Sequence, residues 1–188
     1  MMKYDYKELE LSDNTSTGMI LRQVTPGSTV LEFGCAAGRM TKYMKEKLGC
    51  SVYIVEYSEE GYRAASAYAV DGVCGDIMDF HWMQAFGDVK FDFLVFADVL
   101  EHLRDPQQVL TKARALLKEE GAVLCSIPNA GHGDILLNLY ENRFRYSTVG
   151  LLDQTHIHLF AYQEIEPMMS RAGYKITNEE AVFMISEL

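Results

Sequence analysis

Short apolar runs alternate with amphipathic stretches along most of the chain. The apolar runs, several of them rich in β-branched residues, predict strands at residues 29–33, 51–56, 72–74, 91–97 and 121–127. Apolar residues at helical spacing predict helices at residues 14–23, 39–48, 59–69, 79–86 and 106–118. Strands that alternate with helices indicate a mostly parallel sheet with helices on both faces. We therefore expect an α/β fold with three layers.

Capping residues mark the starts of two predicted helices. Asp13 or Asn14 can cap the first helix, and Asp105 followed by Pro106 opens the helix that ends near Lys118. Right-handed crossovers place the carboxyl ends of the parallel strands at one edge of the sheet. Sheets of this type bind ligands at that edge, so the site is expected where the first, second and fourth strands end.

The alternation breaks after the fifth predicted strand. Residues 131–160 are rich in aromatic, arginine and histidine residues, and they contain one predicted helix at 132–140. A helix at 162–172 follows, with Gly173 at its C-terminal cap, and residues 174–185 are expected to form a sixth strand or an extended tail. No repeat or linker divides the chain, so residues 1–188 are predicted to form a single domain.

Composition and charge narrow the class of partner. Of the 188 residues 48% are hydrophobic and 23% charged, as in ordinary globular proteins. The formal net charge of −10 repels nucleic-acid phosphates, so no nucleic acid is expected as a partner. No apolar run could span a membrane, and the polar N-terminus lacks the core of a signal peptide, which favours a cytoplasmic protein. The four cysteines lack metal-type spacing and indicate free thiols in a reducing compartment.

The strongest candidate for a ligand site begins at residues 30–38, with the sequence VLEFGCAAG. Small residues between a strand and a helix let a ligand approach the backbone closely. Glu56 ends the second predicted strand, where an ionised carboxylate can accept hydrogen bonds from both hydroxyl groups of a ribose. Asp76 follows the third strand, where it can accept a hydrogen bond from an adenine amino group. The pattern indicates a ligand that contains adenosine.

The loop also distinguishes between nucleotide cofactors. A dinucleotide loop needs a third glycine at the position that Arg39 occupies. Glu32 beside the loop would repel a pyrophosphate, but it suits a cofactor that carries an ammonium and a sulfonium group. S-adenosylmethionine (AdoMet) is therefore favoured, and an NAD-dependent oxidoreductase is the least favoured alternative.

The same residues resemble a known family, the class I AdoMet-dependent methyltransferases. VLEFGCAAGRMTKYM resembles their first motif, IVEYSEE the second, GDI the third, FDFLVFADVLEHLRDP the fourth and LLKEEGAVLCSIPN the motif of the fifth strand. The order and spacing of these motifs agree over about residues 14–175. The resemblance implies the three-layer Rossmann-like sheet of this class, a methyltransferase activity and AdoMet as the cofactor.

The resemblance also implies roles for individual residues. The methionine part of AdoMet would be lined by Glu32, Gly34, Cys35 and Ala36, while Gly38 would let the following helix approach. Glu56 would hold the ribose. The positions beside the adenine would be Tyr57, Ser58, Asp76 and Ile77, and those below the sulfonium Ala97, Asp98 and Val99.

The chain departs from the family pattern near its C-terminal end. Members of the family usually finish the sheet with two antiparallel strands, and too few residues follow Gly173 to form both. We expect a shortened sheet edge, or an edge that a partner subunit covers in a homodimer or a heteromer.

The segment 150–160 resembles part of a methyltransferase subgroup that acts on small molecules, and it would lie over the sulfonium in a lid formed by residues 131–160. The candidate catalytic residues are His156 and His102, because a histidine near neutrality can take a proton from an oxygen or nitrogen nucleophile. The alternative for both is a structural role. His156, His158 and Asp153 could share a metal ion, but no fourth ligand is spaced for it, so no metal is assigned.

Two hypotheses for the function follow. The first is an enzyme that moves a methyl group from AdoMet to an oxygen or nitrogen of a small-molecule acceptor. The second is a non-catalytic AdoMet-binding module, or a subunit that depends on a partner.

Overall fold

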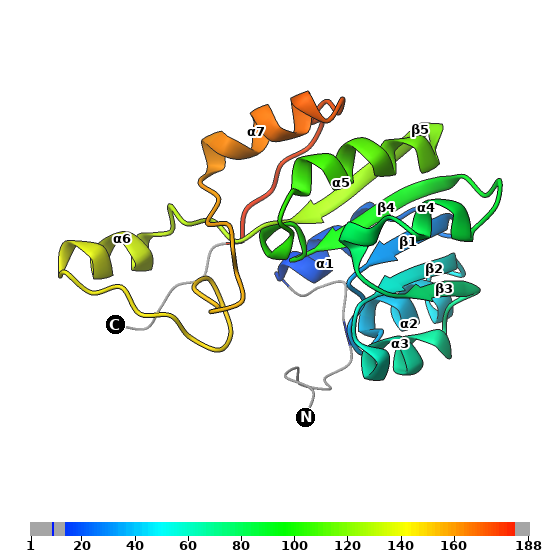
Figure 1. Ribbon diagram of the computed structural model, residues 1–188, viewed down its shortest axis with the longest axis horizontal. Helices are drawn as coiled ribbons and strands as arrows, with labels where there is room; N and C mark the ends of the chain where they lie inside the picture. Colours follow the sequence, from blue (N-terminus) through cyan, green and yellow to red (C-terminus); the bar gives the residue numbers. More distant parts are fainter. Residues whose placement is uncertain (1–8, 10–13, 183–188) are drawn as a thin grey trace.

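The computed structural model describes Leu9 and residues 14–182, and its centre is a sheet of five parallel strands. The strands are β1 (Thr29–Phe33), β2 (Ser51–Glu56), β3 (Asp71–Cys74), β4 (Phe91–Ala97) and β5 (Leu117–Ser126). Their order across the sheet is β3-β2-β1-β4-β5, so the strand order reverses between β1 and β4 (Figure 1). The parallel pairing that the sequence predicted is confirmed.

The largest difference from the predicted strands is at β5, which begins at Leu117 rather than at residue 121. A register shift between Phe91 and Phe93 lets Leu117 pair with Phe91 and Ala122 pair with Phe93. A Cβ atom at Gly121 would lie 2.8 Å from the Phe91 carbonyl oxygen, so this irregularity needs a glycine. The residues directly before Gly121 are polar, so the apolar pattern does not predict that the strand has already begun.

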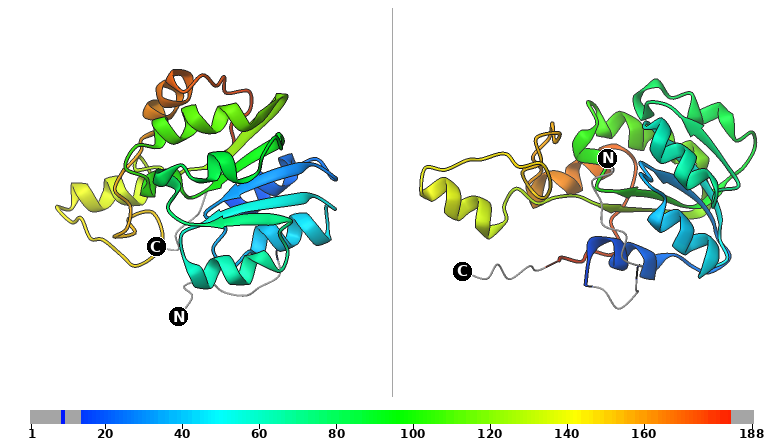
Figure 2. Two further views of the ribbon diagram at one scale, coloured as in Figure 1. Left: turned by 45° about the vertical axis from the view of Figure 1, so that its right-hand side comes forward. Right: turned by 90° about the horizontal axis from the view of Figure 1, so that it is seen from below.

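Helices cover both faces of the sheet. One face carries α1 (Ser16–Gln23), α2 (Arg39–Glu46) and α3 (Glu59–Ser66), and the other carries α4 (Trp82–Ala85), α5 (Pro106–Ala113) and α7 (Tyr162–Arg171) (Figure 2). Successive side chains of β1 point to opposite layers: Val30 packs with the first group, and Leu31 with the second. Among the described residues, no helix has the length and apolar content that crossing a membrane requires.

The cap of α1 differs from the prediction. Thr15 is the capping residue, and its Oγ1 accepts a hydrogen bond from Gly18 N at 3.1 Å. Asn14 lies one residue before the cap, and Asp13 lies outside the described residues. The hydroxyl of Thr15 satisfies an amide of the first turn in the way that the aspartate or asparagine was expected to do.

Several predicted helices are shorter than the pattern suggests, and in two of them the backbone changes conformation within the predicted stretch. The stretch 79–86 contains only the end of the 3-10 helix η1 (Ile77–Asp79) and the four-residue α4, because Phe80 adopts a positive φ of 58° between them. The helix predicted to reach Lys118 ends as α5 at Ala113 and continues as the 3-10 helix η3 (Arg114–Leu116) before the chain enters β5.

The helix α6 (Gly133–Tyr140) stands away from the sheet (Figure 1). The Nδ1 atom of His132 caps it, accepting a hydrogen bond from Asp134 N at 3.3 Å. Ile135 is its one buried apolar residue, whereas Tyr140 is 91% exposed. The sequence predicted this helix correctly, but most of its apolar face has no counterpart among the described residues.

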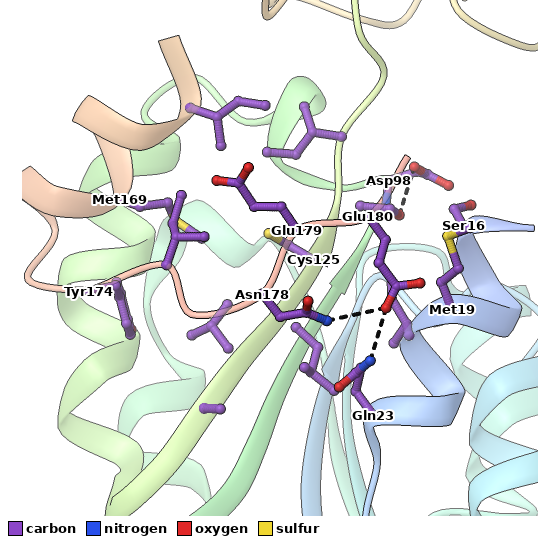
Figure 3. Close-up of a pocket in the computed structure, with 18 of the residues that line it drawn as sticks. Ser16, Met19, Gln23, Asp98, Cys125, Met169, Tyr174, Asn178, Glu179 and Glu180 are labelled. Atoms are coloured by element: carbon purple, nitrogen blue, oxygen red, sulfur yellow. Dashed lines mark hydrogen bonds between the residues drawn. The ribbon is translucent and has the colours of Figure 1, made fainter. Parts of the chain in front are cut away.

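Of the two alternatives predicted for residues 174–185, a sixth strand or an extended tail, residues 174–182 form the tail, and residues 183–185 lie outside the described part. Tyr174 packs on the α7 side of the sheet, and its hydroxyl donates to the Leu110 carbonyl oxygen. Farther along, Glu180 accepts a hydrogen bond from Gln23 of α1, which lies on the opposite face (Figure 3). The tail therefore crosses β5 from one face to the other instead of pairing with its edge.

Candidate functional site

The loop between β1 and α2 adopts a left-handed backbone at Gly34, Ala36 and Gly38, with φ of 68°, 48° and 75°. A Cβ atom on Gly34 would lie 2.8 Å from Val99 Cγ2, and one on Gly38 would lie 2.7 Å from Ala65 Cα. Both glycines therefore permit a close approach of neighbouring protein segments as well as the unusual backbone. From the sequence, we attributed the small residues of this loop to the approach of a ligand. At Gly34, the close contact with Val99 also requires a residue without a side chain.

Glu56 joins the end of β2 to this loop. Its Oε2 atom accepts a hydrogen bond from Ala36 N at 2.7 Å, and its Oε1 atom accepts one from Ser58 N at 2.8 Å. The residue is only 7% exposed, so these amides compensate part of the cost of burying a carboxylate. Each oxygen can accept a further hydrogen bond, which leaves Glu56 able to bind hydroxyl groups of a ligand.

A hollow of about 400 Å³, named here the strand-end hollow, opens at the carboxyl ends of β1, β2 and β4. Its lining consists of Gly34, Ala36, Glu56, Tyr57, Asp76, Ile77, Asp98, Val99, His102 and Leu103. All of these except Leu103 are candidate site residues of the sequence analysis, and no signal in the sequence singled out that leucine. The topological argument therefore located the hollow correctly.

The charge of the strand-end hollow decides which ligands it can take. Glu56, Asp76 and Asp98 contribute carboxylates, and no lysine or arginine occurs among the lining residues. A phosphate would meet three carboxylates there and no lysine or arginine of the described residues. Hydroxyl and amino donors and a positive sulfonium find acceptors, so the donor set fits an adenosyl sulfonium compound.

The remaining cofactor candidates, which do not line the hollow, are Glu32, Cys35, Gly38, Ser58 and Ala97. Glu32 is buried beneath the loop, where it accepts a hydrogen bond from Thr41 Oγ1 at 2.7 Å. Cys35 is also buried, and Ser58 caps α3. Ser58 N also donates to Glu56, so this residue helps to position the carboxylate that lines the hollow.

Burial raises the pKa of Glu32 from 4.5 to about 7; the hydrogen bond from Thr41 lowers this pKa, and the nearby Glu56 carboxylate raises it. A carboxyl group whose pKa is higher in the folded state than in the unfolded state binds a proton on folding. Its stabilising contribution is complete below about pH 4.5 and is lost as the pH rises to about 7.

We expect the stability of Glu32→Gln relative to the wild type to increase from pH 5 to pH 8. The quantity compared is the difference in the free energy of unfolding between the two proteins at each pH. The gain in the free energy of unfolding should be about 2–3 kcal/mol, since one pKa unit corresponds to about 1.4 kcal/mol. Urea unfolding of both proteins at the two pH values measures it. Glu59→Gln, at an exposed position of α3, is the control and should show no such trend. A difference between Glu32→Gln and wild type that does not change with pH would contradict the prediction.

The lid brings the two candidate catalytic histidines together. His102 ends the 3-10 helix η2 (Leu100–His102), and its ring lies 4.8 Å from that of His156, centroid to centroid, at an angle of 75°. The Nδ1 atoms of His102 and His156 face the backbone carbonyl oxygens of Thr155 and Leu151, at 3.1 and 3.2 Å. Burial lowers the pKa of His156, and the neighbouring His102 lowers it further.

Glu101 belongs to the same cluster, although the sequence analysis did not single it out. The residue is 1% exposed, and its Oε1 atom lies 3.8 Å from His156 Nε2. Neither carboxylate oxygen has a hydrogen-bond partner of good geometry among the described residues. Burial raises the pKa of Glu101 to about 8; the backbone N–H of Glu101 itself lowers this pKa, and the charge of Asp98 raises it. Its position directly before His102 is the signal that could have identified it.

Glu101, His102 and His156 are also the described residues that could hold a metal ion, because one ligand atom of each lies within 4.8 Å of the others. The metal site considered in the sequence analysis combined His156 with His158 and Asp153 instead. His158 faces the Arg104 carbonyl oxygen at 3.3 Å, and Asp153 Oδ1 accepts hydrogen bonds from Thr155. Among the described residues, Glu101 and His102 form a possible metal group with His156, and His158 and Asp153 do not belong to it.

A second, open groove lies between α1, β5, α7 and the tail (Figure 3). Its lining includes Met169 and Glu180, and at one end it reaches Glu101 and His156. Asp98 and His102 line both this groove and the strand-end hollow. The cluster of Glu101 and the two histidines thus lies where a ligand in the groove would meet one in the hollow.

Comparison with known sequences places these features in a family. A family model described as a methyltransferase domain matches residues 10–179. The ubiquinone biosynthesis O-methyltransferase of Actinobacillus pleuropneumoniae is 32% identical over 110 residues, which cover 55% of this chain and 47% of that protein. An uncharacterised protein of Methanocaldococcus jannaschii is 24% identical over 155 residues, or 82% of this chain and 68% of that one. The match spans about half the length of the ubiquinone enzyme.

Solved structures share the fold. An AdoMet-dependent methyltransferase of Archaeoglobus fulgidus has a TM-score of 0.60 at 17% identity, with 78% of this chain and 61% of that chain covered. A chain from a complex that contains the Trm112 methyltransferase activator of Haloferax volcanii has a TM-score of 0.66 at 17% identity, with 89% and 71% covered. At these identities the likeness concerns the fold alone, and it confirms the expected three-layer Rossmann-like sheet.

Proposed function

We propose, from the premise that this chain belongs to the methyltransferase-domain family, that it transfers a methyl group from AdoMet to an oxygen or nitrogen atom of a small molecule. The observation that carries the proposal is the strand-end hollow, in which carboxylates and left-handed backbone surround a space that no lysine or arginine of the described residues lines. That chemistry suits a cationic sulfonium joined to an adenosine, and it opposes a phosphorylated nucleotide.

In this proposal, different lining residues bind different parts of the cofactor. Glu56 would accept hydrogen bonds from the ribose, and Asp98 and Val99 would lie next to the sulfonium. The adenine would be flanked by Tyr57, Asp76 and Ile77, and the methionine part by Gly34 and Ala36. The other candidates, which do not line the hollow, would hold these residues in position: Glu32, Cys35, Gly38, Ser58 and Ala97.

The chain's own contribution to the reaction is positioning and control of a proton. When bound, AdoMet supplies the methyl group: the sulfur keeps the electron pair of the broken bond, and a lone pair of the acceptor forms the new bond to carbon. The protein must hold the acceptor in line with that bond and exclude water. His102 and His156 lie at the junction of hollow and groove, where their unprotonated nitrogens can assist removal of the acceptor's proton.

A small acceptor is favoured over a nucleic acid for two reasons. The net charge of −10 opposes the approach of a polyphosphate. The relative of named function quoted above is a ubiquinone biosynthesis O-methyltransferase, whose name indicates methylation of a small molecule on oxygen.

The second candidate is a subunit that depends on a partner. It is supported by the exposed apolar face of α6 and by the structural neighbour that was solved in a complex with a methyltransferase activator. A subunit of this kind would bind AdoMet but remain inactive until its partner was added.

The test is a comparison of cofactor binding with turnover. S-adenosylhomocysteine should bind to the isolated protein in calorimetry, and radiolabelled AdoMet should pass its methyl group to a small molecule of a deproteinised cell extract. Binding without turnover, followed by turnover in the presence of a protein fraction, would favour the partner-dependent subunit. Absence of binding would refute both forms of the proposal.

A further inference from the structure

We propose that Glu101, His102 and His156 form a divalent-cation site that holds a hydroxyl group of the acceptor against the strand-end hollow. The inference about the acceptor rests on the proposed methyltransferase function, whereas the cation site itself does not. Two imidazoles and one carboxylate form a ligand set that many divalent transition metals accept. One ligand atom from each of the three residues lies within 4.8 Å of the others.

The Glu101 carboxylate is the first observation that calls for a cation. Its side chain is 1% exposed, yet neither oxygen has a hydrogen-bond partner of good geometry among the described residues. Leaving a buried carboxylate without donors is costly. Asp98, whose charge acts on Glu101, adds further negative charge on the side of the strand-end hollow. A cation between these groups would remove the cost.

The orientation of the two imidazole rings is the second observation. Nδ1 of His102 faces the Thr155 carbonyl oxygen, and Nδ1 of His156 faces that of Leu151. A carbonyl oxygen is only an acceptor, so each Nδ1 carries the hydrogen and each neutral ring keeps its lone pair on Nε2. Metal-binding histidines are commonly held in this way by a backbone carbonyl on the other nitrogen. His156 Nε2 lies 3.8 Å from Glu101 Oε1, so a lone pair and a carboxylate face each other.

The backbone keeps the three side chains together. Ile157 N and His158 N both donate to the Glu101 carbonyl oxygen, at 3.0 and 3.1 Å. These bonds fasten the lid to the residue that supplies the carboxylate. The lid and η2, which are distant in the sequence, therefore supply one ligand set on a shared support.

Such a site would select acceptors with hydroxyl groups. Three protein ligands leave about three positions of an octahedral cation for water or for acceptor oxygens. A bound cation lowers the pKa of a hydroxyl that coordinates it, so the proton leaves to water and the electron pair stays on oxygen. That pair then forms the bond to the methyl carbon as the sulfur takes the pair of the bond that breaks. With the cation bound, His102 and His156 act as ligands, and water takes over the role of proton acceptor that was proposed for them above.

The test uses manganese as the probe. Protein stripped with EDTA and then dialysed against buffer without chelator is titrated with Mn²⁺ in the presence of S-adenosylhomocysteine, and free Mn²⁺ is followed by electron paramagnetic resonance. We expect one Mn²⁺ per chain in the wild type, and at least a 100-fold weaker affinity in Glu101→Gln, His102→Asn and His156→Asn, since even the loss of an outer-shell partner costs about 10- to 100-fold. The matched control is His81→Asn, at an exposed histidine outside the cluster, which should bind Mn²⁺ like the wild type.

The outcomes separate this inference from the proposed function. If S-adenosylhomocysteine binds but Mn²⁺ does not, or if His102→Asn binds Mn²⁺ as the wild type does, the cation site is refuted and a proton shared between Glu101 and His156 replaces it. His102 is exposed, so its variant remains folded and informative even if Glu101→Gln does not fold. If S-adenosylhomocysteine itself fails to bind, the proposed function fails, whatever the result with manganese.

Discussion

Replacement of Glu56 by alanine is expected to weaken the binding of S-adenosylhomocysteine by about 10- to 150-fold. This range corresponds to the loss of hydrogen bonds to a charged group, about 1.5–3 kcal/mol, at about 1.4 kcal/mol for each tenfold change. Two effects contribute: the ribose would lose its acceptor, and the amides of Ala36 and Ser58 would lose the carboxylate that holds them.

The effect on the ligand can be separated from the effect on the loop. Calorimetry gives the dissociation constant, and thermal unfolding shows whether the variant keeps its fold. Glu56→Gln retains the length of the side chain and one carbonyl oxygen, so it should bind better than Glu56→Ala while remaining weaker than the wild type. Glu59→Ala, at an exposed position of α3, is the matched control. Wild-type affinity in Glu56→Ala would show that the strand-end hollow does not hold the ribose.

Gly34→Val is expected to lower the free energy of unfolding by about 2–5 kcal/mol and to abolish the binding of S-adenosylhomocysteine. The left-handed backbone at φ 68° costs a residue with a side chain about 1–2 kcal/mol. The new Cβ would also lie 2.8 Å from Val99 Cγ2, and overpacking of this kind costs about 1–3 kcal/mol. Relief of either strain would move a loop that lines the hollow.

A matched glycine separates the two costs. Gly49 has a similar φ of 66°, but nothing lies within 4 Å of the Cβ that a substitution would add. Gly49→Val should therefore show the backbone cost alone in urea unfolding, and it should keep full affinity for the ligand. Adding Val99→Ala to Gly34→Val should recover part of the lost stability, because the substitution removes the methyl group that clashes. Equal losses in Gly34→Val and Gly49→Val would show that Val99 does not crowd this position.

The sequence predicted the elements well where one physical signal dominated. The strands β1, β2 and β4 have the predicted bounds, because each is a buried apolar run between turn residues. The prediction was wrong where long-range pairing overrides the local pattern. The start of β5 at Leu117 depends on a register shift opposite Phe91. For residues 174–185 the sequence left a sixth strand and an extended tail open, and the described residues 174–182 form a tail that crosses β5.

One half of the candidate site could be predicted from the sequence, and the other half could not. Glu56 and Asp76 follow strands whose ends must meet at one edge, so topology alone brings them together. The cluster of Glu101, His102 and His156 joins the turn after β4 to a lid that is distant in the sequence. Each histidine could be proposed separately, but no local pattern predicts that they meet, or that Glu101 is buried without a donor between them.

The sequence by itself determined the alternation of strands and helices, the parallel sheet and the edge at which the strand-end hollow opens. Those features follow from local hydrophobic periodicity and from the handedness of crossovers, both of which act over short stretches of chain. Only the tertiary structure decided which side chains face the hollow, that Glu32 supports the loop from beneath it, and that the lid places His156 against Glu101. These features depend on packing and hydrogen bonds between segments that are distant in the sequence. A local sequence pattern therefore does not predict them.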